Sequence, residues 1–344
     1  MSSLLEQEIF SQPEVITRLL EHEIMHVQRI VAQLPPFDYI LIAARGSSDH
    51  AATYAKYAWG THGRYPVALA APSLNTIYHK PPRMNNALVI GISQSGQSPD
   101  IVSVLDEGKR QGRPTIAITN DGNSPLAAIA DHVVELHAGS ERSVAATKTY
   151  TAQLAIMMLF AAAWSKQQER FAELQQIPQA IAATLQSSVE IAQRVERYRY
   201  MQNCVVIGRG YNTSTALELA LKLKELTYTM ASAYSSADFW HGPIATIEAG
   251  TPTILITPAG ATVDDMMELA SALQQRHAEL LIISDLPQAL KIARTSFPLT
   301  AHLPEWLSPI ATIIPGQLMG LHLTLSRGLD PDGPRGLSKV TKTL

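Results

Sequence analysis

The residues best suited to chemistry in this sequence are serines gathered in one short segment. Residues 92–100 read Ile-Ser-Gln-Ser-Gly-Gln-Ser-Pro-Asp, at the end of an apolar run. Gly96 allows a backbone to approach a ligand closely, and Pro99 suits the first turn of a helix. Hydroxyl and backbone N–H groups at a helix N-terminus bind anions such as phosphate. The segment therefore predicts a phosphate site in a strand-to-helix loop.

A plain helix cap is the alternative interpretation, because serine before proline is a common helix start. One cap needs only one serine, whereas three cluster here, and this favours phosphate binding. The loop has neither the terminal Gly-Lys-Ser/Thr of a P-loop nor the repeated glycines of a dinucleotide site. A second loop, after an earlier apolar run, would face the same crevice. The candidate phosphate ligands in the two loops are Ser47, Ser48, Ser93, Gln94, Ser95 and Ser98.

A second candidate site lies in a helix predicted at residues 216–226. Glu218, Lys222 and Glu225 stand at spacing i, i+4, i+7, so they share one face of an otherwise apolar helix. A solvated stripe with a Glu–Lys pair is the simple interpretation. In the alternative, the stripe lines a polar cleft, where a carboxylate beside a lysine is tuned for proton transfer. The pattern alone leaves both open.

Two further segments carry side chains suited to proton transfer or amine chemistry. His241 precedes Gly-Pro in a predicted turn. A loop histidine is usually just exposed, but histidine is also the side chain best suited to acid–base work near neutral pH. The tail at 330–342 carries Lys339 and Lys342 between prolines, glycines and apolar residues. A frayed terminus is one interpretation of this tail, and a tail folded back across a site is the other.

The elements that must position these residues occur twice along the chain. Apolar, β-branched runs recur at a fixed offset, and each is followed by a helical pattern or a turn. The paired runs are 39–44 with 204–208, 87–92 with 253–256, and 115–119 with 280–284. The ends of the paired runs are 164, 164 and 165 residues apart. Three strand ends in register at one offset indicate an internal duplication.

This alternation of strands and helices predicts an α/β protein with two doubly wound parallel sheets, whose ligands lie beyond the carboxyl ends of the strands. The second repeat has Thr-Pro-Ala-Gly where the first has its serine loop, and Pro258 removes a backbone donor, so we expect a phosphate site in the first repeat only. The expected parts are N-terminal helices 1–38, a first domain 39–165, linker helices 166–202, a second domain 203–327, and a tail 328–344 over the active site.

Composition restricts the classes of partner. The net charge is −3 and the basic residues are scattered, which argues against nucleic acid. No apolar run approaches the ~18 residues of a membrane helix. The single cysteine, Cys204, rules out an internal disulfide and fits a reducing compartment. We therefore expect a cytoplasmic protein with a small-molecule partner.

Five motifs together resemble the sugar isomerase (SIS) family. They are Arg-Gly-Ser-Ser at 45–48, the serine loop at 93–98, Val-Ala-Ala-Thr-Lys-Thr at 144–149, Leu-Lys-Leu-Lys-Glu at 221–225 and His-Gly-Pro at 241–243. Within the family, the chain looks most like the isomerase half of glucosamine-6-phosphate synthase and the stand-alone glucosamine-6-phosphate deaminases. The resemblance covers nearly the whole chain. It implies two tandem flavodoxin-like SIS domains, usually assembled as a homodimer.

The resemblance also implies catalytic roles. Glu225 would be the base that moves a proton between C1 and C2 of the sugar. His241 would assist ring opening, in this family often from the neighbouring subunit, and Glu218 and Lys222 would line the sugar site. Lys339 matches a tail lysine that forms a Schiff base with the keto sugar.

The residues alone do not rank Lys339 above Lys342 as the reactive tail lysine. The six loop residues would hold the phosphate, and Ala145 and Ser338 would complete the substrate-binding set. Ser232 and Asp238 stand where the synthase usually has glutamates, which leaves the identity of the sugar open. The sequence starts with helices and lacks a terminal cysteine nucleophile, so ammonia release from glutamine by that route is not expected.

The expected activity is therefore that of an amino-sugar-phosphate isomerase and deaminase, which would convert glucosamine 6-phosphate or a similar sugar into fructose 6-phosphate and ammonia without a metal or other cofactor. One alternative is a deglycase of a fructosamine-type 6-phosphate. Another is a glutaminase-less isomerase of the synthase type. A non-catalytic regulator that binds a sugar phosphate is a third, disfavoured because Glu225 and His241 are both present.

Overall fold

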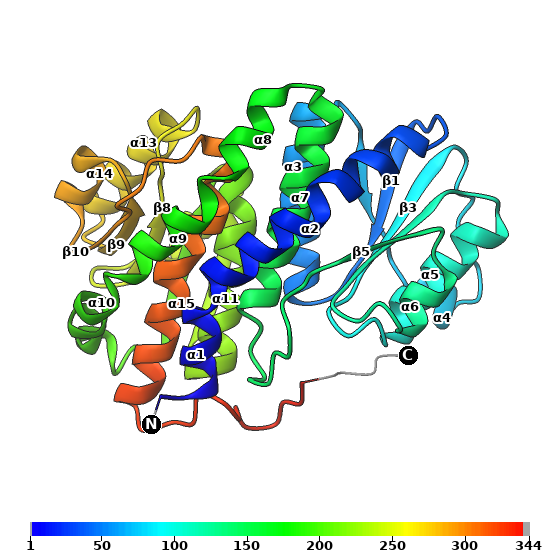
Figure 1. The fold of residues 1–344 in the computed structure, drawn as a ribbon. Helices are drawn as coiled ribbons and strands as arrows, with labels where there is room; N and C mark the ends of the chain where they lie inside the picture. The colour runs from blue at the N-terminus through cyan, green and yellow to red at the C-terminus, as the bar shows by residue number, and fades with distance from the viewer. Residues whose placement is uncertain (1, 340–344) are drawn as a thin grey trace. The chain divides into compact units, whose positions relative to one another are not determined.

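The computed structural model describes residues 2–339, which form two compact units, each built on its own five-stranded parallel sheet (Figure 1). We call them the first-repeat unit (residues 14–141, 148–175 and 338–339) and the second-repeat unit (residues 2–13, 142–147 and 176–337). Each unit is described on its own below.

The sheet of the first-repeat unit has the strand order β2-β1-β3-β4-β5, with every pair of neighbours parallel. Its strands are β1 (Tyr39–Ala43), β2 (Val67–Leu69), β3 (Ala87–Ile92), β4 (Thr115–Thr119) and β5 (His132–Glu135). The order reverses direction between β1 and β3, which are adjacent in the sheet. This is the flavodoxin-like arrangement, in which ligands bind beyond the carboxyl ends of the two central strands.

Helices cover both faces of this sheet. On one face, Leu41, Val89 and Ala117 pack against α5 and α6, and helices α3 and α7 pack against each other. Helix α7 is apolar almost throughout, as expected of a helix buried on all sides. The helices of this unit are α2 (Gln12–Gln33, from residue 14), α3 (Ser47–His62), α4 (Ser73–Thr76), α5 (Pro99–Arg110), α6 (Pro125–Ile129), α7 (Lys148–Ser165) and α8 (Gln168–Leu174).

The second-repeat unit repeats this topology with the order β10-β9-β8-β6-β7, again parallel throughout. Its strands are β6 (Asn203–Gly208), β7 (Met230–Ser235), β8 (Pro252–Ile256), β9 (Glu279–Ser284) and β10 (Thr295–Pro298). Counted within the repeat, this is the same 2-1-3-4-5 order. The predicted α/β class with two doubly wound sheets is therefore confirmed.

The helices of the second-repeat unit also form two layers. One face of the sheet packs against α13 through Met266, Leu269 and Leu273, and α11 packs against α15 (Figure 1). The helices are α1 (Leu4–Phe10), α9 (Ile177–Leu185), α10 (Ser188–Val195), α11 (Thr213–Thr227), α12 (Ser236–Trp240), α13 (Val263–Gln275), α14 (Pro287–Ile292) and α15 (Ser308–Ser326), with short 3-10 turns at 196–198, 210–212, 243–246 and 305–307. Among residues 2–339, no helix is long and apolar enough to cross a membrane.

Candidate functional site

The serine loop joins β3 to α5 at the carboxyl edge of the first sheet. Gly96 has φ +61°, and a side chain there would place its Cβ 2.1 Å from Ser124 Oγ, so only glycine fits. The Gly96 N–H donates to Ser93 Oγ at 3.1 Å, and the Gln97 N–H donates to Ser95 Oγ at 3.3 Å. These bonds hold the loop in a tight turn at the switch point of the sheet.

Ser98 occupies the N-cap position of α5, but its hydroxyl makes no capping hydrogen bond. Ser124, at the N-cap of α6, does accept such a bond from Ala127 N–H. Plain capping therefore does not account for Ser98. Its hydroxyl lies at the positive end of a twelve-residue helix, where an anion is favoured.

The loop after β1 lies beside the serine loop, because Ala43 pairs with Gly91 across the two adjacent strands. Ser47 opens α3 there and is half-buried. Ser48 is buried, and its Oγ accepts a hydrogen bond from Gln153 Nε2 of α7 at 3.0 Å. Gln153 is a residue that the sequence analysis missed, because it lies 105 positions away in an apolar helix.

The charged residues of α11 form a buried triad in the second-repeat unit. Lys222 Nζ lies 3.3 Å from Glu218 Oε1 and 2.6 Å from Glu225 Oε2. The side chains of Glu218 and Lys222 are almost fully buried, and that of Glu225 is 22% exposed. The simple interpretation of a solvated stripe is therefore wrong. The triad carries two carboxylates against one ammonium, and its accessible member is Glu225.

The Lys222 ammonium is stabilised by the two carboxylates. Burial acts to lower the pKa of Lys222, but the charges of Glu218 and Glu225 outweigh it and raise that pKa above its ordinary value. The lysine therefore stays charged at neutral pH and holds the Glu225 carboxylate in place. A partly exposed carboxylate next to a fixed cation is suited to accepting and returning a proton.

His241 lies in the turn after α12 and is exposed, and its backbone N–H donates to Asp238 O at 3.1 Å. Within the described part of the chain, its imidazole has no hydrogen-bond or ion-pair partner. Among the described residues, Glu218, Lys222 and Glu225 contact one another, whereas His241 contacts none of the three.

The tail lysine is held by a carboxylate that the sequence analysis missed. Lys339 Nζ donates to Glu141 Oε2 at 2.5 Å, and the Glu141 side chain is fully buried. Glu141 also accepts from Thr149 N–H at 3.1 Å and from Thr149 Oγ1 at 2.7 Å. Lys339 is therefore ion-paired here, whereas Lys342 lies outside the described residues.

The two remaining candidate substrate-binding residues are Ala145 and Ser338. Ala145 is fully buried in the segment 142–147, whose Val144 N–H donates to Asp332 O of the tail at 3.3 Å. Ser338 directly precedes Lys339. Only residues 144–147 of this segment belong to the family motif at 144–149, and Glu141 lies outside it.

In the second repeat, backbone donors of the loop after β8 already bind carboxylates from other segments of the chain. Ala261 N–H donates to Glu305 Oε2 at 2.8 Å, and Ala259 N–H donates to Asp285 Oδ1 at 2.7 Å. Thr262, the counterpart of Ser98, directs its Oγ1 at Glu305 Oε1 at 3.4 Å. The chain's own carboxylates thus take the donors of this loop, which agrees with a phosphate site in the first repeat only.

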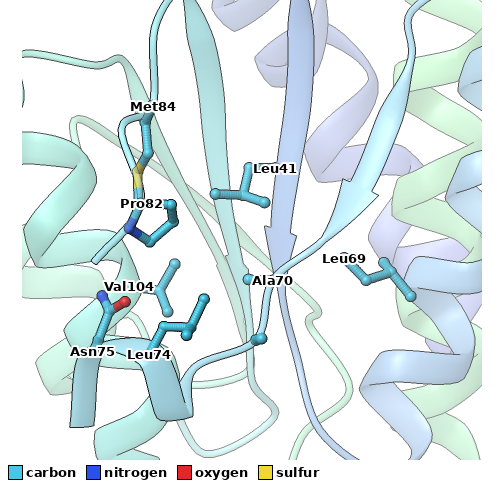
Figure 2. A pocket seen from close by; sticks show the side chains of 9 residues that line it. Leu41, Leu69, Ala70, Leu74, Asn75, Pro82, Met84 and Val104 are labelled. Carbon is cyan, nitrogen blue, oxygen red and sulfur yellow. The ribbon is translucent and has the colours of Figure 1, made fainter. Parts of the chain in front are cut away.

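A cavity of about 220 Å³ lies on the α5 side of the first sheet (Figure 2). Leu41 of β1, Leu74 of α4 and Val104 of α5 line it, and Asn75 is its polar member. The Asn75 Nδ2 donates to Ser103 O. This lining is unsuited to a phosphate group, so the serine loop remains the candidate anion site.

Among the described residues, no group of three or more His, Cys, Asp or Glu side chains is arranged to hold a metal ion.

The chain is thus a two-domain α/β protein with two flavodoxin-like sheets and a candidate anion-binding loop at the switch point of the first. The SIS domain family model matches residues 38–163 and 200–325, so the chain belongs to the SIS domain family. The resemblance inferred from the five motifs is confirmed.

The curated relatives are longer proteins. The chain is 32% identical over 338 residues to a glutamine–fructose-6-phosphate aminotransferase [isomerizing] of Pyrococcus horikoshii, and 34% identical over 351 residues to the protein of that name from Gloeobacter violaceus. The alignments cover 97% of this chain in both cases, but only 56% and 57% of the relatives. The chain therefore spans little more than half of their length.

Solved structures give the same relationship. The C-terminal domain of glucosamine-fructose-6-phosphate aminotransferase from Francisella tularensis has a TM-score of 0.87 and 26% identity, covering 97% of this chain and 98% of that chain. Glucosamine-6-phosphate deaminase from Thermotoga maritima has a TM-score of 0.78 over 99% of this chain and all of its own, and at 22% identity it shares the fold.

Proposed function

We propose that this chain is a phosphosugar isomerase that acts on an amino-sugar 6-phosphate and releases ammonia. Glucosamine 6-phosphate or a close analogue is the substrate, and fructose 6-phosphate is the product. The observation that carries the proposal is the buried Glu218–Lys222–Glu225 triad, a proton-transfer group in a chain related to proteins named for glucosamine and fructose 6-phosphates.

The serine loop binds the phosphate group in this proposal. Ser93, Gln94, Ser95 and Ser98 supply hydroxyl, amide and backbone donors, with Ser47 and Ser48 from the neighbouring loop. The free capping position of Ser98 and the left-handed Gly96 support this assignment. Ala145 and Ser338 complete the substrate-binding set.

Glu225 performs the proton transfer. It accepts the proton from C2 of the open-chain amino sugar and returns it to C1, while the C1 oxygen gains a proton and the nitrogen loses one, which leaves an imine at C2. Water then adds to the imine carbon, the C–N bond breaks, and ammonia leaves, so that a ketose phosphate remains. Lys222 and Glu218 fix the orientation of Glu225, and His241 assists ring opening.

Lys339 forms a Schiff base with the keto sugar in this scheme. The ion pair with Glu141 holds the Lys339 side chain in place. The chain acts as a homodimer in the cytoplasm. A deglycase of a fructosamine 6-phosphate uses the same proton transfer, and it differs only in the group on the C2 nitrogen.

The decisive experiment is a panel of phosphorylated sugars assayed with the purified chain. Glucosamine 6-phosphate should yield ammonia and fructose 6-phosphate in equal amounts, and unphosphorylated glucosamine should react far more slowly. If an N-substituted fructosamine 6-phosphate reacts and glucosamine 6-phosphate does not, the chain is a deglycase. If a sugar phosphate binds but no member of the panel is converted, the chain is a sugar-phosphate-binding regulator.

A further inference from the structure

Arg45 links the loop after β1 to the helix that follows the serine loop. It follows β1 by two residues, and β1 is the direct neighbour of β3, from which the loop begins. Its guanidinium reaches Asp100 in the first turn of α5, where the loop ends, with Nη2 at 2.8 Å and Nε at 3.2 Å from Oδ2. The guanidinium is therefore held at the first turn of α5, directly after the candidate phosphate loop.

Asp100 is a rigid anchor for this arginine. Its side chain is only 2% exposed, and its Oδ1 accepts a hydrogen bond from Thr76 Oγ1 of α4 at 2.9 Å. The preceding residues of α4, Leu74 and Asn75, form one wall of the apolar cavity (Figure 2). Packing of α4 therefore fixes the carboxylate, and the carboxylate fixes the guanidinium.

Arg45 retains the capacity to bind a second anion. A guanidinium has five N–H donors, of which two are directed at Asp100 Oδ2. The arginine side chain is 48% exposed although its partner is buried. A cation fixed at one end and open at the other is pre-organised for a phosphate oxygen, because it loses little side-chain entropy on binding.

A carboxylate near Arg45 adds negative charge to this end of α3. Asp49 lies in the first turn of α3, next to Ser48, and it interacts electrostatically with Arg45. Burial raises the pKa of Asp49, while the charges of His50 and Arg45 act to lower it. A dianionic phosphate in this loop would meet the negative charge of Asp49 unless a cation offset it.

The second repeat contains the corresponding pair in a looser form. Arg209 and Asp265 follow Arg45 and Asp100 by 164 and 165 residues, but Nε and Oδ2 are 3.9 Å apart and the side chains are 37% and 38% exposed. Asp265 also accepts a hydrogen bond from Ser236 Oγ. The tightly anchored arginine thus occurs in the repeat with the serine cluster.

We propose that Arg45 binds the phosphate group of the substrate directly, with Asp100 and Thr76 holding it in position. The inference rests on the proposed function in one respect, since it takes the serine loop as the phosphate site. It assigns to that site a charged residue outside the serine motif.

Titration calorimetry of the full chain with inorganic phosphate and with fructose 6-phosphate tests this inference. A hydrogen bond to a charged group contributes roughly 1.5–3 kcal/mol, so R45Q should raise Kd about 10- to 150-fold. R45K keeps the charge but not the planar fork, and its Kd should lie between those of the wild type and R45Q. K109Q is the matched control, because Lys109 is also 48% exposed and lies at the other end of α5. Its Kd should stay within about twofold of the wild type.

Since R45Q leaves a buried carboxylate without its cation, the double variant R45Q/D100N removes both charges and guards against misfolding. It should bind phosphate as weakly as R45Q. If R45Q and the double variant bind like the wild type, Arg45 does not contact phosphate and the proposed function still stands. If the wild type binds neither ligand, the phosphate site and the inference both fail.

Discussion

The two repeats share a topology but have kept different functional parts. The first has the serine loop after β3, and its α3 carries Tyr54, Ala58 and Thr61 at the positions of the triad. The second has the triad on α11, and its loop after β8 binds the chain's own Glu305 and Asp285. One repeat is therefore suited to anion binding and the other to proton transfer.

The largest expected effect concerns Glu225 in the second repeat. E225Q keeps the shape of the side chain but removes the base, so turnover should fall by about 10²–10⁴ with little change in substrate binding. E190Q, on an exposed helix position of the same unit, should retain full activity. Exchange of the C2 proton with heavy water at the normal rate in E225Q would rule out this role for Glu225.

Removal of the Lys222 ammonium should destabilise the second repeat. K222M leaves two carboxylates close together in a buried site, and breaking a buried ion pair costs about 3–5 kcal/mol. Urea denaturation should show that loss in the free energy of unfolding. K109M, at a half-exposed position of the first repeat, should stay within about 0.5 kcal/mol of the wild type. Equal stability of K222M and K109M would contradict the buried, coupled triad.

The third prediction tests whether the serine loop after β3, and not the loop after β8, binds the phosphate group. Hydrogen bonds to a charged phosphate contribute roughly 1.5–3 kcal/mol each, so S95A/S98A should raise the KM for the phosphorylated substrate at least tenfold and leave the fold intact. T262V alters the counterpart of Ser98 in the second repeat and should leave KM unchanged. If both variants change KM alike, the loops are not specialised.

A fourth prediction tests whether His241 acts across a homodimer. E225Q and H241N are each expected to be inactive, and random co-assembly gives about one half mixed dimers. If each site combines Glu225 of one protomer with His241 of the other, a mixed dimer has one intact site. Co-refolded samples should then recover about a quarter of full activity. Mixed dimers shown to be present yet as inactive as either parent would place His241 within its own chain's site, or outside the reaction.

The smallest effect is expected at the loop after β8, whose backbone donors bind Glu305 and Asp285. E305A removes the acceptor of Ala261 N–H and should lower the free energy of unfolding by about 1 kcal/mol. Because that loop takes no part in phosphate binding, the Kd for fructose 6-phosphate should not change. A marked loss of affinity in E305A would assign substrate binding to both repeats.

Much of the fold could be predicted from the sequence. The runs at 87–92 and 115–119 coincide with β3 and β4, and the predicted helix at Pro99 begins there. Runs of β-branched residues that are buried on both faces give a strong local signal. The outer strands β2, β5, β7 and β10 gave no comparable signal, because one or both of their faces are less buried.

The candidate site was predictable only in part. The residue types in the serine loop and on α11 were sufficient to select both segments, since spacing along a loop or helix determines which side chains share a face. The settings of these residues were not predictable. The same Glu–Lys–Glu spacing fits a solvated stripe and a buried triad, and only the packing around α11 excludes water.

The sequence by itself determined the duplication, the parallel sheets and the chemistry of the two key segments, because these follow from local patterns. The tertiary structure alone decided which distant side chains meet. It pairs Arg45 with Asp100 across 55 residues, Glu305 with Ala261 across 44, and Lys339 with Glu141 across 198. Such pairs depend on where the folded backbone brings two chain segments together, and no local periodicity encodes that.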